Sequence, residues 1–302
     1  MDKFLIKPEN DIKKEVIRII LSQVVSIHEM TCDRSNGINE NVHEMRKRFK
    51  MIRSVIRLIR DSAGYSVYYR ENIRFRDLSR KLSSARDSEV LLQNAIKIGE
   101  KIPQFINDNK YKAILFNLTQ KRDRALYKIL KEEKVCDQIR NTLEEAIPVI
   151  HDINIKKTGF DVIEKGMKRM YRQAKKYLNT VIENNEDPVA IHTLRKRVKY
   201  LWYQIQMLEP VFPEQINAIA VSLDQIADEL GIHRDNYLFQ LSLQKNDFFQ
   251  LNKTHRSEIM KITNKEKKLQ AAIEAAQKFY SEKPKDFTGR IRNWYNLSQQ
   301  TQ

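Results

Sequence analysis

VHEMRKRFK, at residues 42–50, returns as IHTLRKRVK at residues 191–199. Each copy places a histidine after an apolar residue and then adds a run of cations. A second pair follows, because LSSARD at residues 82–87 matches LGIHRD at residues 230–235. His43 and Asp87 are 44 positions apart, and His192 and Asp235 are 43 positions apart. Two landmarks in one order at one spacing indicate a duplicated unit of about half the chain.

The composition favours long helices joined by short loops. The chain has 302 residues, of which 41% are hydrophobic, and only 7 glycines and 7 prolines to form turns. Many short strands would need more turn residues than this. The β-branched run at residues 16–20 lies inside a longer helical periodicity, so it does not indicate a strand. The sequence therefore predicts an all-α fold with two similar halves that share one interface.

Apolar periodicity divides the chain into a first repeat at residues 1–150, a second at 151–250 and a C-terminal helical extension at 251–302. The segment from Pro148 to Gly159 is the best candidate for a linker between the halves. The predicted helices are approximately 9–30, 41–61, 66–99 with a break near Ser83–Ser84, 110–146, 160–183, 188–209, 213–230, 234–247 and 253–281. Residues around Trp294 give no clear prediction.

The charge balance indicates a polyanionic partner. Lys and Arg number 55 against 39 Asp and Glu, which leaves a net charge of +16. Such a charge favours nucleic acid, acidic lipid or polyphosphate as a ligand. No apolar run is long enough to span a bilayer and no signal peptide is evident, so we expect a soluble cytoplasmic protein. Cys32 and Cys136 show no metal-ligand spacing, and a disulfide between them is not expected in a reduced cytosol.

The two histidine segments each combine an apolar stripe with a cationic one. Residues at i, i+3, i+4 and i+7 share one face of a helix. The predicted core stripes are Val42, Met45, Phe49, Ile52, Ile56 and Ile59, and then Ile191, Leu194, Val198, Leu201, Ile205 and Leu208. The cationic stripes beside them are His43, Arg46, Lys47, Lys50, Arg53 and Arg57, and then His192, Arg195, Lys196 and Lys199. Like charges on one face are costly unless an anion binds them.

A third cationic stripe precedes the second histidine helix. It contains Lys165, Lys168, Arg169, Arg172, Lys175 and Lys176, and Lys13, Lys14 and Arg18 occupy the corresponding part of the first half. Facing basic stripes on paired helices would line a groove. The alternative is an ordinary surface whose cations pair with acids on other helices, such as Asp87 and Asp235. The Arg-Asp pairs 86–87 and 234–235 are expected to form salt bridges that orient the basic residues, and ordinary helix N-terminal chemistry is the alternative.

The histidines allow three interpretations. Metal ligation needs several converging ligands, and His43 and His192 have no HExxH or CxxC pattern near them, so no metal site is predicted. A buried, hydrogen-bonded structural role is the second. A phosphate contact near a helix N-terminus is the third, because anions are favoured there.

Together these motifs resemble the CHAD family, the histidine-containing α-helical domain, over roughly residues 10–250. The resemblance implies two four-helix bundles related by a pseudo-twofold axis, whose basic helices line a central groove that binds inorganic polyphosphate. It also implies association with polyphosphate granules. It carries phosphate binding to His43, Arg46, Lys47, Lys50, Arg53, Arg57, Arg169, Arg172, His192, Arg195, Lys196 and Lys199. In the second half Trp202 and Gln206 replace the equivalents of Arg53 and Arg57, which implies fewer contacts there.

The leading hypothesis is therefore a non-catalytic polyphosphate-binding module without a cofactor. A nucleic-acid-binding helical protein is the alternative, favoured by Tyr200, Trp202 and Tyr203 near the second stripe. A phosphohydrolase ranks third, because no carboxylate cluster or activated nucleophile is visible. The Glu-x-Glu-x-Lys motif of triphosphate tunnel enzymes is absent, so any such catalytic domain would be another chain. The sequence leaves the oligomeric state open.

Overall fold

The computed structural model describes residues 4–32, 37–102, 105, 108–184, 187–244, 257, 259–261, 263 and 266–300. Every regular element in these ranges is a helix, so the predicted all-α class is confirmed. The helices in chain order are α1 (Ile12–Cys32), α2 (Ile38–Leu58), α3 (Arg60–Ala63), α4 (Tyr65–Lys81), α5 (Ser83–Gly99), α6 (Asn109–Tyr127), the π-helical η3 (Lys128–Glu132), α7 (Val135–His151), α8 (Asp161–Glu183), α9 (Pro188–Gln206), the 3-10 turn η4 (Glu209–Val211), α10 (Pro213–Gln244), α12 (Glu266–Phe279) and α13 (Pro284–Gln300).

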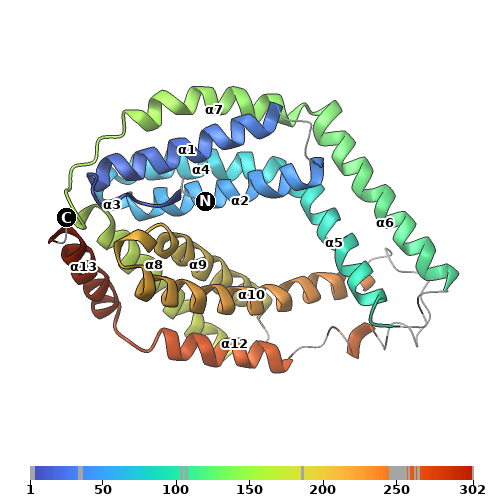
Figure 1. Cartoon of the computed structure of the whole chain (residues 1–302). Coiled ribbons are helices and arrows are strands. Elements are labelled where there is room, and N and C mark those ends of the chain that lie inside the picture. Colours follow the sequence, from blue (N-terminus) through green and yellow to red (C-terminus); the bar gives the residue numbers. More distant parts are fainter. Residues whose placement is uncertain are drawn as a thin grey trace.

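The helices form two groups that meet along α2 and α9 (Figure 1). In the first group α1 packs on α2 and α7, and α2 packs on α4. In the second group α9 packs on α8 and α10, while α12 and α13 cover α8. Helices α5 and α6 extend to one side as an antiparallel pair, and α5 also contacts α10. The C-terminal helix α13 lies at the opposite end from this pair.

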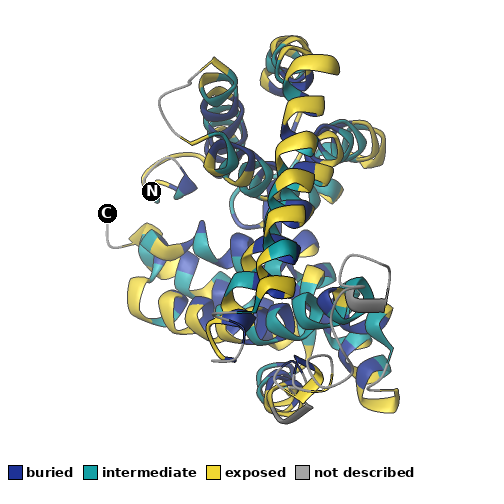
Figure 2. Ribbon diagram, turned by 90° about the vertical axis from the view of Figure 1, so that its right-hand side faces the viewer, coloured by how far each residue is buried: buried dark blue, intermediate teal, exposed yellow. Residues whose placement is uncertain are grey.

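The apolar stripes predicted for the histidine helices form the centre of the core. Every member of both stripes is buried, from Val42 to Ile59 on α2 and from Ile191 on α9 to Leu208 just beyond it. Figure 2 shows the same division for the whole molecule, with buried residues on the faces that the helices turn toward one another. One hydrophobic cluster runs through both groups, and a smaller one fills the space among α5, α6 and Phe239. Burial of these faces is the main force that holds the helices together.

Close backbone contacts join the two groups. Gly166 of α8 lies against the backbone of α2, where a Cβ would stand 1.9 Å from the carbonyl oxygen of Leu58. Ser62 Oγ donates to the Val162 carbonyl at 2.8 Å. The Gln204 amide of α9 donates to the Ser54 carbonyl at 3.0 Å, and both groups are buried. These contacts hold α2, α8 and α9 at close range.

Several predicted boundaries are wrong for identifiable reasons. The single helix expected at 110–146 is interrupted, because η3 widens the coil and Lys134 takes a left-handed φ of 47°. The expected linker starts late, since α7 includes Pro148 and continues to His151. Buried Ile150 keeps that last turn packed on the core. The break expected between 230 and 234 is absent, and α10 continues through Gly231. The break near Ser83 is confirmed.

Candidate functional site

The cations of α2 and α9 meet around Lys50. Its side chain is exposed to solvent, yet desolvation lowers its pKa to about 8, and the charges of Arg46, Arg195, Arg86 and Arg234 lower it further. These four arginines come from α2, α9, α5 and α10, so both groups of helices contribute. We call Arg46, Lys50, Arg86, His192, Arg195 and Arg234 the central cluster. The cost of gathering these charges indicates a site for an anion.

Two arginines of the central cluster are held in equivalent ways. Arg46 Nη1 donates to the Ser79 carbonyl and to Ser83 Oγ, each at 2.7 Å. Arg195 Nε donates to the Ala227 carbonyl at 3.1 Å. In the sequence repeat, Arg46 corresponds to Arg195 and Ser79 to Ala227. The duplicated motif therefore forms the same arginine-to-carbonyl contact in both halves.

A glycine gives Arg195 its space. A Cβ on Gly231 would lie 2.8 Å from Arg195 Nε and 2.9 Å from Nη2. The first copy has Ser83 at the matching position, where the hydroxyl accepts from Arg46 instead. The first half therefore holds Arg46 with a hydrogen bond to Ser83, and the second half leaves space for Arg195 at Gly231.

The aspartates of the two Arg-Asp pairs support these arginines. Desolvation lowers the pKa of Arg46, and Asp87 opposes that shift. Desolvation likewise lowers the pKa of Arg195, and Asp235 opposes it. This electrostatic support agrees with the orienting role expected for the pairs. The arginines of the same pairs, Arg86 and Arg234, belong to the central cluster itself.

The histidines differ in their surroundings. His43 is exposed, and desolvation together with Arg86 lowers its pKa. His192 is half-buried, and desolvation together with Arg234 lowers its pKa to about 4. The buried Nδ1 atom of His192 has no hydrogen-bond partner. Neither residue is the buried, hydrogen-bonded histidine of the structural interpretation.

A second group of cations lies further along the same helices. We call Arg53, Arg57, Lys196 and Arg197 the outer cluster. The pKa of Lys196 is lowered by desolvation and then by Arg197, with Arg57 and Arg53 also contributing. Asn72 Oδ1 of α4 accepts from Arg53 Nε at 3.2 Å and from Arg57 Nη2 at 3.0 Å. One neutral amide thus positions two guanidinium groups from the neighbouring helix.

Arg169 and Arg172 of α8 continue the outer cluster toward α3. Desolvation lowers the pKa of Arg169 to about 10, and Arg60, Arg172 and Arg57 add to this. The Arg169 guanidinium also donates to the Asp61 carboxylate. Of the remaining cations in that stripe, Lys175 donates to the carbonyls of Ser281 and Glu282, both at 3.1 Å, so it supports the chain between α12 and α13.

Besides Arg169, two of the expected site residues, Lys199 and Lys47, have acidic partners among the described residues. Lys199 Nζ lies 2.7 Å from Asp224 and 3.3 Å from Asp228, and 4.2 Å from the centre of the Trp202 ring. Lys47 Nζ lies 3.5 Å from Glu44. Because these charges are partly neutralised, the two lysines stand apart from the central cluster.

The sequence pattern did not assign four cations that the structure brings into the two clusters or beside them: Arg60, Arg86, Arg197 and Arg234. The repeated Arg-Asp spacing was a usable signal for Arg86 and Arg234. Arg60 stands three residues after Arg57, which extends the first cationic stripe by one step. Arg197 gave no such signal, because its equivalent Arg48 binds Gln23 on the other side of α2.

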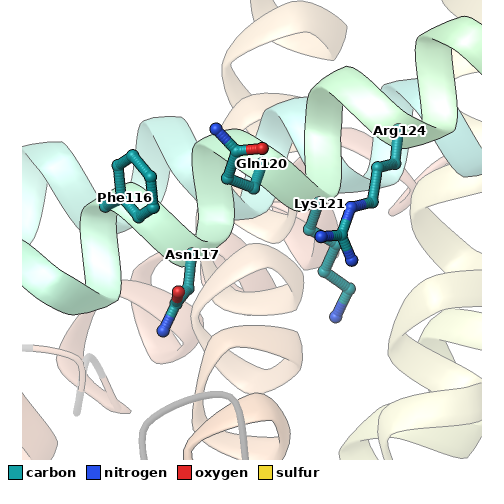
Figure 3. Close-up of a pocket in the computed structure, with 5 residues that line it drawn as sticks. All are labelled: Phe116, Asn117, Gln120, Lys121 and Arg124. Carbon is teal, nitrogen blue, oxygen red and sulfur yellow. The ribbon is translucent and has the colours of Figure 1, made fainter.

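The remaining features of the described residues, namely a surface hollow, metal-ligating groups, apolar helices and cysteines, do not add to the two clusters. An open hollow on α6 is lined by Phe116, Asn117, Gln120, Lys121 and Arg124 (Figure 3), and it contains no member of either cluster. Within the described ranges, no three His, Cys, Asp or Glu side chains gather where a metal ion would bind. No helix in that part of the chain is both long and apolar enough to cross a membrane. Cys32 and Cys136 are free.

Comparisons with known proteins agree with the geometry. The CHAD domain family model matches residues 23–244. The chain is also similar in structure to the crystal structure of the CHAD domain from the plant Ricinus communis, with a TM-score of 0.58 and 16% sequence identity, over 88% of this chain and 89% of that chain. At this identity the likeness shows the fold alone. No match is found among curated proteins. Since the family model spans more than half of the chain, this protein belongs to the CHAD domain family.

Proposed function

We propose that this protein binds inorganic polyphosphate, without catalysis of its own, through the central and outer clusters. The observation that carries the proposal is the setting of Lys50. This lysine is open to solvent, yet four arginines from both groups of helices surround it. A lysine that water reaches but that is also partly desolvated fits a recess between the halves. The resemblance to the CHAD family implies a groove in this place. The equivalent contacts of Arg46 and Arg195 support a pseudo-twofold relation between its two walls.

The chemistry of the clusters suits a chain of phosphates. Guanidinium groups donate in pairs to phosphate oxygens, and such charge-assisted hydrogen bonds are the strong ones. A polymer that spans both clusters also releases many counterions when it binds. We therefore expect the affinity for polyphosphate to fall steeply as salt rises. Membership in the CHAD domain family supports this ligand. We further propose a cytoplasmic location and association with polyphosphate granules.

The test is a charge reversal at Lys50 with a matched control. Lys50→Glu removes a central cation and adds repulsion, so polyphosphate should bind at least about ten-fold more weakly, measured by calorimetry at two salt concentrations. Lys112→Glu makes the same charge change at an exposed position on α6 and should leave the affinity nearly unchanged. Helical content by circular dichroism should match the wild type in both variants. Equal binding by Lys50→Glu and wild type would mean that the clusters are not the site.

A further inference from the structure

A row of alternating aromatic rings and guanidinium groups begins at the surface beside the outer cluster. Tyr65 and Tyr69 of α4 stack on each other with ring centres 6.1 Å apart and planes 29° apart. The Arg60 guanidinium lies 4.9 Å from the Tyr65 ring and 5.0 Å from the Tyr68 ring. Cations at this distance over aromatic faces are held by cation–π attraction.

The row continues inward to α9. Arg57 Nη1 donates to the Tyr68 hydroxyl at 3.0 Å, and the Arg57 guanidinium lies 4.7 Å from the Tyr200 ring. Tyr200 is buried and Tyr68 is half-buried, so the inner end of the row is fixed by packing. At the outer end Tyr65 and Tyr69 are 59% and 55% exposed. The row therefore has a fixed inner end and two open rings at its outer end, Tyr65 and Tyr69, which we call the aromatic platform.

The position of the aromatic platform beside guanidinium groups indicates which class of ligand it could bind. Stacking on tyrosine is a common way to bind a nucleobase, because every base has a flat π-face. The guanidinium groups of Arg60 and Arg57 lie against rings of the row. Arg169 is close enough to both for their charges to help lower its pKa. A ligand that joins an aromatic ring to a short run of phosphates would satisfy both features at once.

We propose that Tyr65 and Tyr69 form a subsite for the base of a nucleoside oligophosphate, whose phosphates extend over Arg60 and the outer cluster. This inference rests on the proposed phosphate-binding role of the clusters. A single-stranded nucleic acid fits less well, because successive bases need successive platforms. Among the described residues, the other exposed aromatic side chains are Phe116 and Tyr127, both on α6 and away from the clusters. One platform at one end of a cationic row matches a ligand with one base.

Calorimetry with ATP and with inorganic tripolyphosphate, in the absence of divalent cations, tests the subsite. The two ligands carry the same number of phosphates, but only ATP has a base. Wild type should bind ATP more tightly, although tripolyphosphate carries at least as much charge. The double variant Tyr65→Ser/Tyr69→Ser should lose roughly five-fold to a hundred-fold in ATP affinity, the range expected for one stacked base. Its affinity for tripolyphosphate should stay the same.

Tyr127→Ser is the matched control, since Tyr127 is 60% exposed on α6. It should bind both ligands as wild type does. If the double variant keeps full ATP affinity while tripolyphosphate still binds, the subsite is refuted and the proposed function stands. If neither ligand binds wild type, the phosphate site and the subsite both fall. An oligoadenylate that binds far more tightly than ATP, with affinity rising for each added base, would replace the inference with a nucleic-acid site.

Discussion

Lys50 stands in surroundings that disfavour its positive charge. Its ordinary pKa of 10.5 is lowered to about 8 in the folded protein, because desolvation and four arginines disfavour its charge. Below pH 8 the lysine is charged in both folded and unfolded chains, and the unfavourable interaction is then felt in full. As the pH rises from 8 toward 10.5, only the unfolded chain keeps the proton, so this contribution to stability becomes less unfavourable.

We therefore predict that Lys50→Gln stabilises the unliganded protein while weakening polyphosphate binding. The free energy of unfolding at pH 7 should rise by roughly 1 kcal/mol. This increase is smaller than the one that the whole pKa shift would give, because water screens the exposed Lys50 side chain. Urea denaturation measures this change, and Lys112→Gln is the control. In wild type, polyphosphate affinity should also fall as the pH rises through about 8, and Lys50→Gln should show a flatter profile. A less stable Lys50→Gln protein would contradict this account.

At the scale of the helix, α10 has a glycine, Gly231, where the Arg195 side chain of α9 packs against it. Helix α10 continues through Gly231, which leaves room for the Arg195 guanidinium. Glycine inside a helix is unfavourable by about 1 kcal/mol relative to alanine. The glycine next to buried Leu230 thus lowers helix stability and leaves space for an arginine.

Gly231→Ala separates these two effects. The added Cβ would displace the flexible end of Arg195, so the free energy of unfolding should be unchanged or should rise by up to about 1 kcal/mol. Polyphosphate affinity should nevertheless fall several-fold, because Arg195 would lose its contact with the Ala227 carbonyl. Thermal unfolding and calorimetry on one preparation measure both quantities. Loss of stability together with unaltered binding would show that Gly231 serves packing alone.

At the scale of the whole molecule, the two groups of helices depend on close backbone approach between α8 and α2. The Gly166→Ala variant would place a Cβ against the Leu58 carbonyl, and neither backbone can move without disturbing the Ser62–Val162 contact. We predict a loss of roughly 2–3 kcal/mol in the free energy of unfolding. Gly289→Ala in α13 is the control, because nothing lies within 4 Å of its added Cβ, and it should raise stability slightly. Similar unfolding curves for the two variants would rule out this close contact.

The sequence alone determined the features that depend on local periodicity. Scarcity of glycine and proline predicted the all-α class, and residues three and four apart defined the core stripes of α2 and α9, all of which are buried. The repeated histidine segments likewise located the cations of those helices, since neighbours on one helix face are fixed by helical geometry. Local preferences alone also predict helix ends at Pro148 and near Gly231. Both predictions are wrong, because packing in the core outweighs the preference of one residue.

The tertiary structure decided which cations gather and which pair with acids. Lys50 and Lys199 look alike in their stripes, but one lies among four arginines and the other between Asp224 and Asp228. Arg86 and Arg234 enter the central cluster only because α5 and α10 pack beside α2 and α9. The row of aromatic rings and guanidinium groups likewise needs α4, α3 and α9 together. Charge interactions act through space, so their partners depend on how distant segments pack, which no periodicity within one helix specifies.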